Sequence, residues 1–268
     1  MSKAAKRERQ RLNRETARQA REAAQRRSRQ RRTLRNVLIF AVIGVVVFVL
    51  FAVLGDDDEG DESSATTTTV ASTTTSASSA LPAGCREVEA PAPKDVSFPE
   101  PPAMEIDPAG TYTARMQTTC GEIAIALDAA TAPQSVNNFV FLARQGFYDG
   151  LAFVRSAAGF VVQAGSPTQD NAGGPGYSLQ GEVPADGYEL GSVAMAKGGS
   201  EAPGTAGSQF FIVTSPDGPA KLTPDYAVVG TVTEGLEVAQ TIESLAPPSG
   251  DGPPTRPVVI ERVTIEES

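Results

Sequence analysis

An uninterrupted apolar run near the N-terminus divides this chain into parts that fold in different surroundings. The run covers residues 37–54, VLIFAVIGVVVFVLFAVL, and its eighteen residues include no charged or polar side chain. A helix of this length spans about 27 Å, close to the hydrocarbon thickness of a bilayer. A buried core helix and a cleaved signal peptide are the alternatives. Core helices are seldom apolar all round, and the acidic sequence GDDDEGDE follows where a signal peptide would be cut, so we predict a transmembrane helix.

Charge is distributed unevenly on the two sides of this run. Residues 1–36 hold fourteen Lys or Arg against three acids, a net charge of +11, so the remainder of a chain with net charge −9 carries −20. Because basic residues favour the cytoplasmic side of a membrane, we predict a single-pass cell-membrane protein with a cytoplasmic N-terminus. Everything after Leu54 is then extracytoplasmic. Its acidic balance argues against nucleic acid as a partner of this part.

The segments that flank the run have no composition suited to a core. Residues 1–36 are rich in Arg, Ala, Gln and Glu, which favours a helix that is charged all round. We favour a topogenic basic segment lying against anionic lipid, and an RNA- or ribosome-binding arm is the alternative. Residues 55–108 are acidic, then rich in Ser and Thr, then rich in Pro, and we predict that they form a disordered tether.

The chain contains two cysteines, Cys85 and Cys120. An extracytoplasmic location permits a disulfide between them. Two unpaired thiols are the alternative, and the spacing does not decide between them.

From residue 109 to residue 268 the pattern changes to short β-rich segments separated by Gly, Pro and Asp. TYTARMQTT and EIAIALD alternate apolar and polar residues and predict a hairpin that turns at Cys120 and Gly121. TAPQSVNNFVFLARQG predicts a helix that ends before Gly146, and residues 234–245 predict a second one. RPVVIERVTIEE predicts a last strand. Many short strands with two helices indicate a mainly β domain, a closed barrel with helical caps.

The absence of histidine from the chain removes several kinds of chemistry. Ser-His-Asp triads, Cys-His dyads and His-ligated zinc are excluded. What remains notable is Arg155, a single cation inside the apolar stretch FVRSAAGFVVQAG. Rotation about an X-Pro amide suits such a site, because a cationic donor aimed at the proline nitrogen draws its lone pair out of conjugation. That reaction uses no nucleophile, metal or cofactor. The alternative is a strand arginine whose head reaches water.

Five motifs in order carry a resemblance to a known family: FVRSAAGFVVQAG, GGPGYSLQGE, GSVAMA, AGSQFFIV and LTPDYAVVG. Together they resemble the cyclophilin-type peptidyl-prolyl cis/trans isomerases from about residue 111 to residue 266. The resemblance implies an eight-stranded antiparallel closed β-barrel capped by two α-helices, with no cofactor and no metal. It also implies that the partners are proline-containing polypeptides.

The resemblance assigns roles to individual residues. Arg155 is the expected catalytic arginine, and Gln163 is expected to hold both Arg155 and the substrate carbonyl. Ala196 and Lys197 are expected to meet the substrate backbone. The complete set of expected substrate-binding residues is Phe160, Val161, Met195, Ala196, Lys197, Gln209, Phe211, Leu222 and Tyr226.

The chain departs from the family pattern at the rim of this expected site. Val154 stands where the family often has His, Lys221 where many members have Trp, and Tyr226 where they have His. These departures favour the alternative of a binding or holdase module that grips proline-containing segments with little or no turnover.

The five motifs and the expected extracytoplasmic location lead to the main prediction. We predict an isomerase that acts on X-Pro bonds of exported or cell-envelope proteins and assists their folding.

Overall fold

The computed structural model describes residues 81–268, and its framework is one large antiparallel sheet. The sheet order is β11-β4-β5-β9-β7-β10-β2-β1-β12-β3, and β6 and β8 form a separate two-stranded sheet. The strands are β1 Tyr112–Thr118, β2 Gly121–Leu127, β3 Leu151–Ala152, β4 Arg155–Ala157, β5 Val161–Ala164, β6 Leu179–Gln180, β7 Ser192–Met195, β8 Thr205–Ala206, β9 Phe210–Val213, β10 Val228–Glu234, β11 Asp251–Gly252 and β12 Val259–Glu267. The predicted hairpin is β1 and β2, paired from Tyr112 with Leu127 to Thr118 with Gly121.

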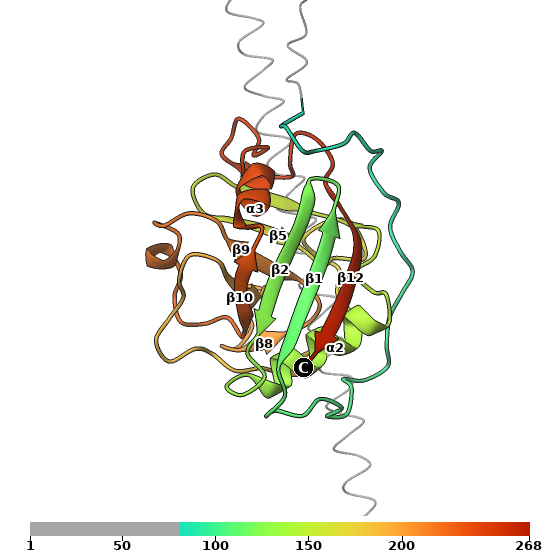
Figure 1. Cartoon of the computed structure of the whole chain (residues 1–268), viewed down its shortest axis with the longest axis vertical. Coiled ribbons are helices and arrows are strands. Elements are labelled where there is room, and N and C mark those ends of the chain that lie inside the picture. The colour runs from blue at the N-terminus through green and yellow to red at the C-terminus, as the bar shows by residue number, and fades with distance from the viewer. Residues whose placement is uncertain (1–80) are drawn as a thin grey trace, which may run out of the picture. The chain divides into compact units, whose positions relative to one another are not determined.

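Two α-helices accompany the sheet, α2 (Pro133–Arg144) and α3 (Leu236–Glu243), with a short 3-10 helix η1 (Pro219–Lys221). Both predicted helices are thereby confirmed. Figure 1 shows α2 and α3 toward opposite ends of the strands. The first turn of α2 is capped from a distant segment, because the Glu182 carboxylate accepts hydrogen bonds from the backbone N–H groups of Gln134 (2.8 Å) and Ser135 (3.0 Å).

The sheet curls, but pairing does not close it. Within residues 81–268 the end strands β11 and β3 are not paired with each other, so the predicted closed eight-stranded barrel is corrected to a curled ten-stranded sheet. Both end strands have only two residues, and β11 contains Gly252 at φ 152. Such short edges present few backbone groups for a further ladder.

Apolar side chains lie on both faces of the curled sheet. The inner face holds the main core, in which Phe139 and Tyr148 stack at 5.0 Å and Phe210 contacts them edge-on at 5.6 and 5.5 Å. The opposite face of β5, β7 and β9 carries a smaller cluster built from Val161, Ala194 and Phe211. This second cluster places a group of apolar side chains outside the core, next to Arg155.

The predicted disordered tether is wrong for residues 81–108. This segment lies along the domain as an ordered strand-free stretch, drawn in teal in Figure 1. Val96 and Phe98 pack against the main core, and a disulfide joins Cys85 to Cys120. The composition favoured disorder, but these tertiary contacts offset the cost of ordering the chain.

The predicted transmembrane helix and residues 55–80 of the predicted tether lie outside the described residues. Residues 81–268 contain no helix that is both long enough and apolar enough to cross a bilayer. The basic segment 1–36, the apolar run 37–54 and residues 55–80 precede this region.

Candidate active site

Arg155 and Gln163 are brought face to face by two short strands. Arg155 opens β4, Gln163 lies in β5, and the two residues are direct partners in the antiparallel register. The turn between the strands is tight, with the Phe160 N–H donating to the Ala157 carbonyl (3.0 Å) and Gly159 at φ 64. This turn places Phe160 beside Arg155, whose guanidinium carbon lies 5.9 Å from the ring centre.

The Arg155 guanidinium is held by a carboxylate. Its Nε and Nη2 donate to the two oxygens of Asp251, each at 2.7 Å. The hydrogen bond from Arg155 lowers the pKa of Asp251, and the same bond raises the pKa of Arg155. This side-on pair uses two of the five guanidinium N–H donors, which leaves three for other partners.

A small pocket of about 110 Å³ lies at this arginine. It is lined by Arg155, Phe160, Val161, Gln163, Ala196, Lys197, Phe211, Leu222 and Tyr226. All nine belong to the eleven residues predicted from the sequence. The structure therefore brings side chains from segments more than sixty positions apart into one pocket.

Aromatic rings form much of the wall of the small pocket. Phe211 contacts Tyr226 edge-on at 5.2 Å, and Tyr188 supports Tyr226 from behind, accepting a hydrogen bond from the Tyr226 N–H at its hydroxyl (2.8 Å). Lys221, which stands at the altered rim, has its Nζ 5.7 Å from the Phe160 ring centre and donates to the Gly159 carbonyl (2.6 Å). Phe160 is thus flanked by two cations.

Met195 does not join this pocket. Its side chain is fully buried in the main core. The reason is strand alternation: Ala194 pairs with Phe211 and shares its outer face, whereas Met195 pairs with Phe210 and points inward. The expectation that Met195 lines the substrate pocket is therefore corrected, and Ala196 is the neighbouring residue that reaches it.

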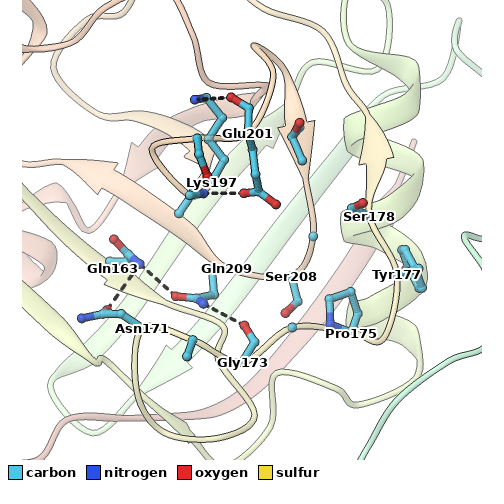
Figure 2. A pocket seen from close by; sticks show the side chains of 17 residues that line it. Gln163, Asn171, Gly173, Pro175, Tyr177, Ser178, Lys197, Glu201, Ser208 and Gln209 are labelled. Carbon is cyan, nitrogen blue, oxygen red and sulfur yellow. Dashed lines mark hydrogen bonds between the residues drawn. The ribbon is translucent and has the colours of Figure 1, made fainter. Parts of the chain in front are cut away.

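A larger pocket of about 410 Å³ adjoins the small one and shares Gln163, Ala196 and Lys197 with it (Figure 2). Gln209, the remaining predicted residue, lies here. Its Oε1 accepts from Gln163 Nε2 (2.9 Å), and its Nε2 donates to the Gly173 carbonyl (2.7 Å). Gln163 Nε2 also lies 3.5 Å from Asn171 Oδ1. This chain of side chains links the two pockets.

Lys197 lines both pockets and carries a paired charge. Its Nζ lies 2.7 Å from Asp225 Oδ2, and its side chain is only 3% exposed. The ammonium also lies 5.5 Å from the Tyr226 ring centre. At the far side of the large pocket, the Tyr177 hydroxyl donates to Asn138 Oδ1 (2.7 Å), and burial raises the pKa of Tyr177 to about 12. Tyr177 is therefore neutral at physiological pH.

Sequence reasoning missed Asp251, Asp225 and Asn171. Asp251 lies in the Gly- and Pro-rich stretch PPSGDGPP, where an acid is expected to be solvated, and its contact with Arg155 spans 96 positions. No local pattern marks such a pair. Among residues 81–268, no group of three or more His, Cys, Asp and Glu side chains is placed to hold a metal ion.

The part of the chain that holds this site matches a known protein family. The model of the family described as "Cyclophilin type peptidyl-prolyl cis-trans isomerase/CLD" matches residues 113–265, more than half of the chain. The chain belongs to the cyclophilin-type isomerase family. All eleven predicted site residues of this cyclophilin lie inside the matched range, as does Asp251.

Curated relatives carry the same family name. A probable peptidyl-prolyl cis-trans isomerase B of Mycobacterium leprae is 36% identical over 65% of this chain and 63% of its own length. The peptidyl-prolyl cis-trans isomerase of Helicobacter pylori is 42% identical over 50% of this chain and 82% of its own. The cyclophilin thus spans somewhat under two thirds of the mycobacterial relative's length.

A solved structure agrees with the fold. The crystal structure of a Cryptosporidium parvum cyclophilin-type isomerase matches with a TM-score of 0.54 and 28% identity, over 59% of this chain and 99% of that one. A second crystal structure of the same protein was obtained in the presence of the dipeptide Ala-Pro. Family and relatives support peptidyl-prolyl cis-trans isomerase activity.

Proposed function

We propose that residues 109–268 isomerise X-Pro bonds in exported or cell-envelope polypeptides, and that residues 37–54 anchor this domain to the membrane. One observation carries the catalytic part: a fixed guanidinium and a ring-lined hollow form one small pocket, with Gln163 opposite Arg155. A proline ring fits the aromatic and aliphatic wall formed by Phe160, Phe211 and Leu222. The amide that precedes the ring then lies beside Arg155.

The chemistry requires stabilisation of a twisted amide. The planar amide owes its barrier of about 20 kcal/mol to conjugation of the nitrogen lone pair with the carbonyl. In the twisted transition state that lone pair is localised and accepts a hydrogen bond. The Arg155 N–H groups that Asp251 leaves free supply the donor, and since Asp251 fixes the guanidinium, little reorganisation is needed.

The shared wall of the two pockets indicates a path for the substrate chain. A polypeptide whose proline occupies the small pocket passes Ala196 and Lys197 and continues into the large pocket. The lining of that pocket includes the uncharged polar residues Ser178, Thr205, Ser208 and Gln209 and the charged residues Lys197 and Glu201. We infer that substrate residues on one side of the proline bind there, with polar side chains favoured over large apolar ones.

The proposed location rests on sequence and on one covalent bond. The apolar run 37–54 with basic residues before it and acidic residues after it supports a cytoplasmic N-terminus. The disulfide between Cys85 and Cys120 belongs in an oxidising compartment, which is consistent with a domain outside the cytoplasm. Exported chains that fold close to the membrane are the expected clients.

A binding module with little turnover is the second candidate. It is favoured by the close pairing of Arg155 with Asp251, which offsets the positive charge that polarises the amide. Lys221 at the rim also departs from the family pattern. The two functions differ in whether Arg155 affects the rate of isomerisation or only the affinity for peptide.

The test uses residues 76–268, in which the described residues 81–268 belong to one compact unit. A protease-coupled assay with X-Pro peptides compares wild type, Arg155→Ala and Arg155→Lys. We expect Arg155→Ala to lower kcat/KM by about 10²- to 10³-fold, the effect of losing one electrostatic donor at a transition state. Arg155→Lys keeps the positive charge but loses the parallel N–H donors of the guanidinium, so its kcat/KM should lie between those of wild type and Arg155→Ala.

Peptide binding measured by NMR titration separates the candidates. Isomerisation near the uncatalysed rate in a folded wild-type protein that binds the peptides would overturn the isomerase proposal and favour the binding module. Equal rates for wild type and Arg155→Ala would remove Arg155 from the mechanism.

A further inference from the structure

A segment outside the family domain lies against the loop that carries part of the site. Residues 92–98, here called the strap, precede the range 113–265 matched by the family model. Residues 166–176, here called the site loop, connect β5 to the strand pair β6 and β8. The Lys94 N–H donates to the Pro167 carbonyl (2.8 Å), and the Phe98 N–H donates to the Pro175 carbonyl (2.7 Å). The strap therefore holds the site loop at both of its ends.

The strap is itself fixed to the body of the domain. Lys94 Nζ donates to three backbone carbonyls, those of Gly146 (3.2 Å), Phe147 (3.1 Å) and Asp149 (2.7 Å). The Phe98 ring contacts the ring of Phe141 edge-on at 5.0 Å, on the outer side of α2. None of these contacts involves the site loop. The strap is thus anchored independently of the loop that it holds.

Backbone approaches backbone where the strap meets the end of the site loop. Gly176 has φ 97, and a Cβ at this position would lie 2.6 Å from the Phe98 carbonyl oxygen. Such a distance is too short for any side chain. The contact between Phe98 and the site loop therefore depends on a glycine at this position.

The opposite side of the site loop faces the catalytic machinery. Asn171 Oδ1 lies 3.5 Å from Gln163 Nε2, and the Gly173 carbonyl accepts from Gln209 Nε2 (2.7 Å) (Figure 2). Inside the loop, Asp170 Oδ1 accepts from the N–H groups of Ala172 (2.8 Å) and Gly173 (3.3 Å). These bonds stiffen the part of the loop between the strap and the glutamines.

We propose that Lys94 and Phe98 are positioning residues for the isomerase site. They hold the site loop so that Gly173 keeps Gln209, and Gln209 keeps Gln163, in place opposite Arg155. The inference rests on the proposed function, because it assigns the strap to the pocket that binds residues flanking the proline. Release of the strap widens the large pocket and weakens binding of those residues, while the small pocket keeps its proline wall.

The test compares Phe98→Ala with Ile265→Ala in residues 76–268. Ile265 is also a partly buried side chain on the main core, but it lies in β12 and has no part in the site loop. Substrates are X-Pro peptides with glycine or a larger polar residue at positions on each side of the proline. We expect Phe98→Ala to raise KM by about 2- to 10-fold, the size of effect that one hydrogen bond has on binding. The increase should appear only for peptides that carry the larger residue on the side of the proline that binds in the large pocket.

A spectroscopic signal reports on the proposed contact itself. Phe98→Ala should shift the side-chain amide NMR signals of Gln209 and Gln163, whereas Ile265→Ala should leave them unchanged. Lys94→Met provides a second variant in case Phe98→Ala does not fold, and it is expected to act in the same direction. Equal effects of the strap and control variants on KM ratios and amide signals would overturn the inference.

The outcome is separable from the fate of the proposed function. If wild type binds the peptides but shows no turnover, the isomerase proposal fails, and the strap is still tested by peptide Kd values and amide signals. If wild type turns over and the strap variants match the control, only the strap inference fails.

Discussion

Asp251 determines which edge of the planar Arg155 guanidinium is free to donate to substrate. The carboxylate occupies Nε and one N–H of Nη2, so the unpaired donors all lie at the other end of the group. The carboxylate is presented by β11, whose Asp251 and Gly252 pair with Ala157 and Ser156 of β4, the strand that carries Arg155. A short edge strand thus fixes the orientation of the expected catalytic side chain.

At this scale we predict the effect of Asp251→Asn. The amide keeps the shape but offers one acceptor in place of two, so kcat/KM should fall by about 3- to 10-fold, a modest effect because water screens this half-exposed pair. The hydrogen bond from Arg155 lowers the pKa of Asp251. The stabilisation that the ionised carboxylate gives to the Arg155 pair is therefore complete above the ordinary Asp pKa, and it is lost as the pH falls through the lowered pKa.

An isomerisation assay from pH 8 to pH 3 checks this prediction, with the exposed Asp186→Asn as the control. The deficit of Asp251→Asn should be constant at neutral pH and should shrink only below about pH 4, where the wild-type carboxylate takes up its proton. A deficit that changes between pH 6 and pH 8 would contradict the assignment.

Single residues also show where sequence reasoning succeeds and where it fails. The nine residues of the small pocket were predictable because their motifs resemble those of a family. Met195 was assigned by the same resemblance, although the strand alternation of GSVAMA contradicts it: if Ala194 and Ala196 face outward, Met195 faces the core. Asp251 was not predictable, because its role depends on a contact with a residue 96 positions away.

At the scale of elements, local signals located the regular structure well. The hairpin, both helices and the last strand follow from residue alternation, Pro133 near a helix start and Gly146 after its end. The strap was missed because its proline-rich composition carries no periodicity, and its order comes from contacts of Lys94 and Phe98 with distant residues. Closure of the barrel was also mispredicted, because the length of edge strands is set by tertiary packing.

The disulfide is a contact between elements with a large expected effect on stability. The bond closes a loop between residues 35 positions apart. Replacing both cysteines by Ser should lower the free energy of unfolding by roughly 3 to 4 kcal/mol, mainly because the unfolded chain without the cross-link has more conformational entropy. Urea unfolding of residues 76–268 with and without the substitutions measures this loss. A change below about 1 kcal/mol would show that the strap is held by its other contacts.

At the scale of the whole molecule, we predict that residues 1–36 and residues 81–268 lie on opposite sides of a membrane. Alkaline phosphatase, which is active only outside the cytoplasm, should be active when fused after residue 268 and inactive when fused after residue 36. Changing Arg31, Arg32 and Arg35 to Glu should reduce this asymmetry, because it removes the basic residues next to the apolar run. Activity of both fusions would contradict the topology.

The cross-link between Cys85 and Cys120 also determines how a pull on the chain enters the domain. Tension applied to residues before Cys85 passes through the sulfur atoms into the turn between β1 and β2, two neighbouring inner strands of the sheet. Residues 86–119 lie inside the covalent loop, so the covalent path of this tension bypasses them. A pull on the residues before Cys85 therefore does not run along the backbone of the strap, and the contacts of Lys94 and Phe98 with the site loop lie off this covalent path.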